Sequence, residues 1–234
     1  MARSDPSMHI EFNTLTAADE DELAVLFGRV FSRRDPPAYA VGLTAAEFEA
    51  FVRLLLPKAA GEGLTRVARN AETWEMIGAL LNEDCAADMP DGLDGLSPKF
   101  DPIFDILVPM SEEYWGTRQP QQGEGLHMFL LGVAESASGR GVGQQLVADS
   151  LTLGSSKGYR KAVTEATNKT SQHIFRKLGF EERVRRSYAS HHFKGQSVFA
   201  SIAEHQGPIL MDRSLTPQAS ISKRANRGQQ ALPN

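Results

Sequence analysis

A glycine-rich turn in the middle of the chain limits the possible folds more than any other feature. The turn spans residues 134–143 and has glycine at positions 139, 141 and 143. An apolar stretch of strand length, residues 126–133, precedes it, and residues 144–151 after it repeat apolar side chains at helical spacing. A strand, a glycine turn and a helix together expose free backbone N–H groups at the positive end of the helix. A pyrophosphate can bind there, because glycine brings no Cβ into its path.

The glycine turn by itself is a weak signal, since a tight strand-to-helix connection without a ligand has the same pattern. Two other phosphate-binding motifs fail on context. No Lys-Ser/Thr pair follows the glycines, as a P-loop requires, and no βαβ unit near the N-terminus carries a dinucleotide fingerprint. The choice therefore depends on a second motif downstream.

Length and composition predict one cytoplasmic domain. The 234 residues fit a single domain over residues 1–213, followed by a polar tail over 214–234 that we expect to be disordered. The formal charge of −4 argues against a nucleic-acid partner. The single cysteine, Cys85, excludes an intrachain disulfide and favours a reducing compartment. The N-terminus does not resemble a signal peptide, and no apolar run is long enough for a membrane span, so no membrane partner is expected.

Local patterns predict alternating helices and strands. Thr16 is an expected N-cap for a helix that must end at Arg34, because Pro36 and Pro37 follow. Thr44 and Glu47 form a capping box that opens a second helix. The other expected elements are a strand from 9, a hairpin of strands 64–69 and 74–81, a helix after 97, a polar connection over 116–125, and one or two strands after 180.

The second motif follows a short predicted strand at 161–166. Residues 167–180 read as a helix that Thr167 or Asn168 caps and that Gly179 ends. Together with the glycine turn, the run from Asn168 through Ser171 to Phe180 resembles the Gcn5-related N-acetyltransferases. In that family the glycine loop binds the pyrophosphate of acetyl-CoA, and the second motif packs beside the cofactor arm.

This resemblance implies an α/β (α+β) fold. The fold has a central mixed, twisted sheet of six to seven strands flanked by helices, with a V-shaped splay at the acetyl-CoA site. No metal cofactor is implied. The cofactor-binding positions carried over are Leu131, Gly132, Val133, Ser138, Gly139, Arg140, Gly141, Val142, Gly143, Gln144, Asn168 and Phe175.

The sequence departs from the family pattern at two places. Ser138 stands where the family has Gln or Arg, so one pyrophosphate contact is lost or shortened. Phe175 stands where many members have a tyrosine thought to protonate the departing thiolate, and a phenyl ring cannot donate a proton. Packing in the core is the simpler role for Phe175.

Within the family, the chain is most similar to the arylalkylamine N-acetyltransferases of the insect dopamine type. The early turn at Asp35, the helix over 167–180 and the ending from Tyr188 to Phe199 carry this likeness. It implies Asp35 as the general base, at a position where the insect-type enzymes have a glutamate before the proline, and it places Thr167 and Ser171 at hydroxyl positions. Each has a simpler alternative: a turn residue before proline for Asp35, a helix cap for Thr167 and a small packing residue for Ser171.

His127 is a second candidate base, because it lies on the central strand in period-two register with Phe129, Leu131 and Val133. A lone histidine on a strand is more often structural. His191 and His192 are adjacent, so a strand would point them to opposite faces, and no further metal ligands accompany them.

The sequence thus predicts an acyltransferase. Acetyl-CoA would donate its acetyl group to a small amine, arylalkylamine-like or polyamine-like, by direct attack in a ternary complex. A non-catalytic acyl-CoA-binding module and a protein-lysine acetyltransferase are the alternatives, and a homodimer stays open.

Overall fold

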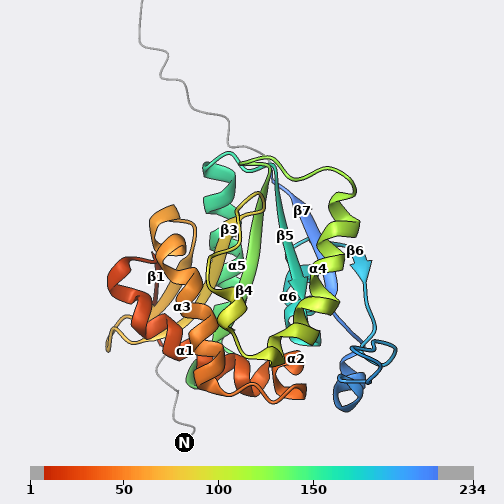
Figure 1. Ribbon diagram of the computed structural model, residues 1–234. Coiled ribbons are helices and arrows are strands. Elements are labelled where there is room, and N and C mark those ends of the chain that lie inside the picture. The colour runs from red at the N-terminus through yellow and green to blue at the C-terminus, as the bar shows by residue number, and fades with distance from the viewer. Residues whose placement is uncertain (1–7, 216–234) are drawn as a thin grey trace, which may run out of the picture.

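Seven strands form one sheet in the order β1-β2-β3-β4-β5-β7-β6 in the computed structural model, which describes residues 8–215 (Figure 1). Neighbouring strands are antiparallel except for β4 and β5, which are parallel. The predicted mixed sheet of six to seven strands is confirmed. The strands are β1 Ile10–Thr14, β2 Arg66–Asn70, β3 Met76–Asp84, β4 Gly125–Val133, β5 Lys161–Ala166, β6 Glu181–Arg185 and β7 Ile209–Ser214.

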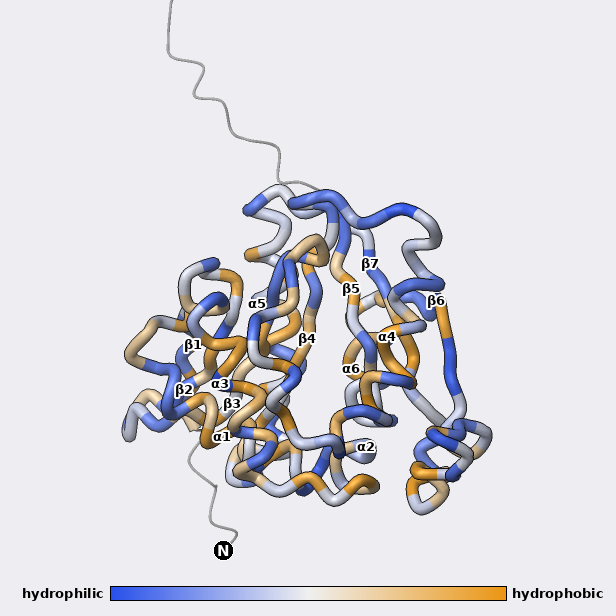
Figure 2. Tube along the Cα trace, viewed as in Figure 1, coloured by the Kyte–Doolittle hydropathy of each residue, from blue (hydrophilic) through white to orange (hydrophobic). Residues whose placement is uncertain are grey.

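Helices cover both faces of the sheet and enclose two large hydrophobic cores, and a smaller third cluster lies between α4 and strands β5, β6 and β7. Residues of α1, α3 and α4 make one core with β3 and β4, while α5 packs on the opposite face together with α6. Figure 2 shows hydrophobic residues along these helices and the central strands. The helices are α1 Glu20–Arg34, α2 Pro36–Ala40, α3 Ala45–Glu62, α4 Asp101–Trp115, α5 Val142–Ser156 and α6 Lys169–Lys177, with 3-10 turns η1 Ala17–Asp19, η2 Leu93–Gly95, η3 Pro98–Phe100, η4 Glu135–Ala137 and η5 Ala200–His205. Within residues 8–215, no helix has the length and apolar character needed to cross a bilayer.

Local signals set the corner between α1 and α2. The first helix ends at Arg34 as predicted, and Asp35 alone separates it from α2, a short helix that the sequence analysis did not predict. The Asp35 side chain accepts a hydrogen bond from the Ala38 backbone N–H and so caps α2, whose first residues are Pro36 and Pro37. Asp35 is therefore held at a rigid junction.

A β-bulge in β4 divides the strand into two registers. Leu81 pairs with Leu130 and Asn82 with Met128, so Phe129 is the extra residue. The predicted common register of His127 with Leu131 and Val133 is therefore wrong. The rings of His127 and Phe129 stack 5.0 Å apart on one side of the sheet, whereas Leu131 and Val133 pack into the core beneath α5.

The strands β4 and β5 separate soon after they start. Their pairing covers only residues 125–127 of β4 and 161–163 of β5. Beyond it, the Thr164 hydroxyl donates to the Met128 carbonyl across 2.9 Å, in place of a backbone hydrogen bond between the strands. The expected V-shaped splay therefore opens from Met128 and Thr164 onward.

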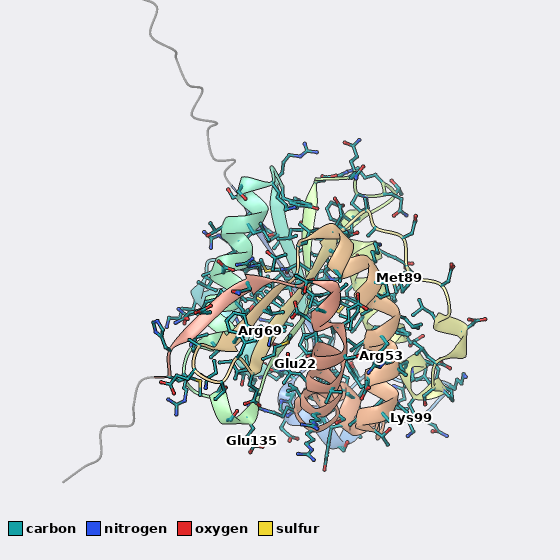
Figure 3. The ribbon with its side chains drawn as sticks, turned by 90° about the vertical axis from the view of Figure 1, so that its left-hand side faces the viewer. Glu22, Arg53, Arg69, Met89, Lys99 and Glu135 are labelled. Carbon is teal, nitrogen blue, oxygen red and sulfur yellow. The ribbon has the colours of Figure 1, made fainter. Side chains whose placement is uncertain are left out.

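Ion pairs tie α1 to the sheet and to α3. The buried Arg69 of β2 donates to Glu22 across 2.8 Å and to Asp19 across 2.6 Å, and Figure 3 shows Arg69 and Glu22 side by side. On the outer face, Arg53 of α3 pairs with Asp21. Because removing one partner of a buried ion pair leaves an uncompensated charge, Arg69 holds the N-terminal end of α1 against β2.

The C-terminal boundary differs slightly from the predicted one. Strand β7 extends through Ser214, where its backbone pairs with Lys161, so the domain does not end at 213. The rest of the predicted tail, residues 216–234, lies outside the described residues.

Candidate functional site

One cavity of about 410 Å³ lies where the sheet splays, between the glycine turn and the aromatic residues of α1, α3 and α4. The predicted cofactor positions line it, all except Gly132 and Arg140. The predicted base Asp35 and the hydroxyl residues Thr167 and Ser171 line the same cavity, whereas His127 does not. The tertiary structure therefore brings the two sequence motifs and the early Asp35 corner to one place.

The glycine turn presents backbone N–H groups to this cavity. Gly139 and Gly141 have φ of +76° and +78°, a left-handed conformation that favours glycine, and Gly141 is the N-cap of α5. The Gln145 N–H donates to the Gly141 carbonyl and begins the helical ladder. The preceding N–H groups, from Val142 to Gln144, have no acceptor within the helix, which suits an anion.

Gly143 of the turn and Gly132 of β4 lie close to neighbouring helices. A Cβ on Gly143 would lie 3.4 Å from the Ile174 side chain of α6, an ordinary van der Waals contact, so α6 packs directly against the start of α5 here. A Cβ on Gly132 would lie 2.8 Å from the Phe27 ring. Gly132 thus faces α1, which explains its absence from the cavity wall.

Arg34 reaches the glycine turn from the last turn of α1. Its Nη2 donates to the Ser138 hydroxyl across 3.3 Å, and both residues line the cavity. Ser138 is the position where the sequence analysis noted a missing Gln or Arg. The structure places a guanidinium there from a segment 104 residues away. No sequence pattern indicated this contact.

Asp35 and Thr167 form the polar centre of the cavity. The Thr167 hydroxyl donates to Asp35 Oδ1 across 2.6 Å, and the Ala38 N–H donates to Oδ2 across 3.2 Å. Burial raises the pKa of Asp35 to about 6, although these hydrogen bonds and the charge of His205 act in the opposite direction. A carboxylate with this pKa is ionised near neutrality and holds a proton more firmly than an ordinary aspartate does.

Thr167 is held in place by a residue that the sequence analysis used only for the family likeness. The Tyr188 hydroxyl donates to the Thr167 carbonyl across 2.9 Å, and the Tyr188 side chain is fully buried. Burial and the nearby charge of Asp35 raise the pKa of Tyr188, so it stays a neutral phenol. The cap of α6 is Asn168, whose side chain accepts from the Ser171 N–H, and Thr167 remains available to Asp35.

Ser171 and Phe175 lie one turn apart on α6 and both line the cavity. The Ser171 hydroxyl donates to the Asn168 carbonyl across 3.0 Å. Phe175 is 2% exposed and meets Phe180 edge to face, with ring centroids 4.9 Å apart. Phe175 therefore packs in the core, as its simpler sequence interpretation proposes.

His127 lies between two carboxylates. Its Nδ1 is 2.9 Å from Glu83 Oε1, and its Nε2 is 2.7 Å from Glu165 Oε2. Burial lowers the pKa of His127, but the two carboxylates outweigh burial and raise the pKa to about 10. A ring protonated at neutral pH cannot accept a proton, which disfavours His127 as the base. Sequence reasoning did not pick out Glu83 or Glu165, because only the sheet order brings their strands beside β4.

Aromatic rings form the wall opposite the glycine turn. Phe31 stacks on Phe48 with centroids 4.7 Å apart, and Phe100 stacks on Phe104 at 5.7 Å. Phe51 connects this group to Phe129 at the bulge. This part of the cavity suits a flat apolar group.

The described residues include no group of three His, Cys, Asp or Glu side chains that could hold a metal ion. Cys85 lies next to Gly125, and burial together with nearby carboxylates raises its pKa. Its thiol is therefore a poor nucleophile.

Comparison with known proteins shows which of them share this architecture. The family model described as FR47-like protein matches residues 115–189, which include both sequence motifs. No curated protein matches the chain by sequence. Among solved structures, arylalkylamine N-acetyltransferase 2 from Aedes aegypti matches with a TM-score of 0.76 and 18% identity, over 89% of this chain and 100% of that chain.

Two further structures extend the comparison. The polyamine N-acetyltransferase of Drosophila melanogaster, which forms N-acetylagmatine, matches with a TM-score of 0.69 and 18% identity, over 88% of this chain and 100% of that one. The N-acetyltransferase YhbS from Escherichia coli, in complex with CoA, matches with a TM-score of 0.50 and 17% identity, over 92% and 86% of the two chains. The chain therefore has the fold of the Gcn5-related N-acetyltransferases, and the resemblance found in its motifs is confirmed.

Proposed function

We propose that this protein is an acetyl-CoA-dependent N-acetyltransferase that acts on small arylalkylamines. One observation carries the proposal: a single cavity joins the N–H groups of the glycine turn to the carboxylate of Asp35. An acyl donor anchored at one end and an amine at the other would meet without leaving the cavity. Direct transfer in a ternary complex follows, since such positioning needs no acyl-enzyme.

The glycine turn supports acetyl-CoA as the donor. The N–H groups between Gly139 and Gln144 would hold the pyrophosphate, and Arg34 would supply a positive charge beside Ser138. The CoA complex of the Escherichia coli protein, which has the same fold, supports this choice of cofactor.

Asp35 fits the role of general base. Alkylamines are mostly protonated at neutral pH, and a carboxylate with a pKa of about 6 can take that proton as the nitrogen attacks the thioester carbonyl. The carbon–sulfur bond then breaks and CoA leaves as the thiolate, which gains a proton afterwards. Because a thiol has a pKa of about 8.5, the thiolate can leave without a tyrosine acid at Phe175. Ser171 remains a candidate for relaying a proton to the leaving sulfur.

The walls of the cavity favour an aryl group over a polyamine. The acceptor end is lined by rings such as Phe31, Phe51 and Phe129. A polyamine would place several charges against these apolar walls, which is costly. Burying a phenyl ring instead contributes about 2 kcal/mol, or roughly thirtyfold in binding.

An amine panel tests the proposal. Transfer from acetyl-CoA to 2-phenylethylamine, tyramine and tryptamine is compared with transfer to agmatine, putrescine and spermidine, with products identified by mass spectrometry. We expect kcat/KM to be at least about thirtyfold higher for the aryl group, from the burial of the ring. CoA binding by calorimetry without transfer to any amine would instead indicate a non-catalytic module, and transfer only to lysine peptides would indicate a protein acetyltransferase.

A further inference from the structure

We propose that Glu165 binds the ammonium group of the incoming amine before Asp35 removes its proton, and that His127 is the positioning residue that holds Glu165 in place. This inference rests on the proposed function and names the residue that makes the site select a cation.

The position of Glu165 follows from the alternation of β5. Lys161 lies over the Tyr114 and Trp115 rings of α4, and Val163 packs with Met110 of the same helix. Glu165 continues this alternation, so its side chain lies on the α4 side of the sheet and lines the cavity. Thr167, which binds Asp35, follows two residues later, a distance of about 7 Å along an extended chain. Glu165 and Asp35 therefore border the same region.

The two oxygens of Glu165 have different surroundings. Oε2 accepts from His127 Nε2, whereas no hydrogen bond from any described residue reaches Oε1. The side chain is only 12% exposed. Because Oε1 has no hydrogen-bond partner among the described residues and Glu165 lines the cavity, a ligand in the cavity that donates hydrogen bonds can reach this oxygen.

The charges around Glu165 call for a cation. His127 lies between the carboxylates of Glu83 and Glu165, so one imidazole is shared by two acidic side chains. The cationic side chains nearby are occupied elsewhere: Lys161 lies against Asp212 and the α4 rings, and Arg34 lies at Ser138. An ammonium group at Oε1 would offset the negative charge of the Glu165 carboxylate and donate charge-assisted hydrogen bonds to it.

His127 acts through Glu165, since it does not line the cavity. With both ring nitrogens protonated, it donates to Glu83 and Glu165 together and fixes the Glu165 carboxylate at the point where β4 and β5 separate. The amine would dock at this point, pass one N–H proton to an Asp35 oxygen and attack as the neutral nitrogen. One N–H bond breaks and one O–H bond forms in that step.

Binding measurements on CoA-loaded protein test the inference without depending on turnover. The ligands are 2-phenylethylamine and its neutral analogue 2-phenylethanol. We expect the natural protein to bind the amine more tightly than the alcohol. The Glu165→Gln variant should lose about 10- to 100-fold in amine affinity while keeping its affinities for the alcohol and for CoA. Glu165→Asp, which keeps the charge, should keep part of the preference, and Glu181→Gln, on the exposed face of β6, is the matched control.

Kinetics separate positioning from a structural role. In Glu165→Gln we expect KM for the amine to rise more than kcat falls. His127→Gln should show the same pattern more weakly, with an unchanged KM for acetyl-CoA. Equal amine affinity in the natural protein and a folded Glu165→Gln variant would overturn the inference. Tight amine binding without any acetyl transfer would instead overturn the proposed function and leave Glu165 as an ammonium site.

Discussion

The Thr167 hydroxyl donates a 2.6 Å hydrogen bond to Asp35 Oδ1 and joins two residues that lie 132 positions apart in the sequence. Oδ2 of the same carboxylate caps α2 through the Ala38 N–H. Both oxygens are therefore oriented by the protein before a substrate arrives. A base held in this way needs little rearrangement to accept a proton, which is the condition for efficient general base catalysis.

Replacing Asp35 by Asn tests that role directly. Asn keeps the shape of the side chain but cannot take a proton, so kcat/KM should fall about 10²- to 10⁴-fold. The loss should shrink at high pH, where more amine is already neutral. For the natural protein, kcat/KM should decline as the pH falls through about 6, because protonated Asp35 is not a base. Equal activity of the Asn variant from about pH 6 to pH 9 would assign Asp35 a purely structural role as a turn residue.

The same substitution should stabilise the fold at high pH. The pKa of Asp35 is raised from 3.8 to about 6, so the protonated form is favoured in the folded state. That stabilisation is fully present below the unfolded pKa and is lost as the pH rises through about 6. Asn avoids this loss but gives up one acceptor oxygen, worth about 1 kcal/mol, which leaves a net gain of about 1–2 kcal/mol at pH 8. Thermal unfolding of the natural protein and the Asp35→Asn variant at pH 4 and pH 8 measures this gain in stability, and the exposed Asp94→Asn variant is the control.

Gly141→Ala should weaken CoA binding about tenfold, since a single hydrogen bond to a charged group contributes about 1.5 kcal/mol or more. The left-handed φ of +78° at Gly141 sets the direction of the N–H groups that would hold the pyrophosphate. Gly158 has a similar φ of +89° and equally open surroundings at the other end of α5, so Gly158→Ala is a matched control. The control should lose comparable stability and keep its CoA affinity by calorimetry. Equal CoA affinity in the two variants would show that the turn does not hold the pyrophosphate.

Arg34→Gln should also lower CoA affinity about tenfold, because a charge-assisted contact to a phosphate contributes about 1.5 kcal/mol or more. Arg34 lies at Ser138 on the cavity wall. Its exposed neighbour Arg33 does not line the cavity, and Arg33→Gln gives the control for net charge. The affinity of the natural protein should fall more steeply with added salt than that of Arg34→Gln. Identical salt dependence would show that the guanidinium does not contact the anion.

Phe175→Tyr should leave kcat within about tenfold of the natural value, because thiolate departure does not depend on an acid at this position. Phe180→Tyr adds the same hydroxyl to the same ring pair, but Phe180 does not line the cavity. The comparison by steady-state kinetics therefore isolates the effect of a hydroxyl facing the cavity. A gain of about a thousandfold for Phe175→Tyr would show that the natural protein is an impaired enzyme and would favour the acyl-CoA-binding module.

The sequence alone determined the features that depend on neighbouring residues. The capping box of Thr44 and Glu47 forms as predicted, and α1 ends where Pro36 disfavours a longer helix. The glycine turn likewise forms the start of α5, since a left-handed N-cap at Gly141 is a local preference of the backbone. These local rules predicted single elements, whereas the fold was predicted through the family resemblance that the two motifs carry.

Only the tertiary structure decided the acceptor end. The bulge at Phe129 arises from a mismatch between β3 and β4, so it reverses the side-chain register without any mark in β4 itself. Glu165 meets His127 because β5 lies beside β4. At the other end of the cavity, Arg34 meets Ser138 because α1 packs against β3 and β4, whose far end leads into the glycine turn. Each of these contacts joins segments far apart in the chain. Their geometry depends on how whole elements pack, and no local pattern of residues encodes it.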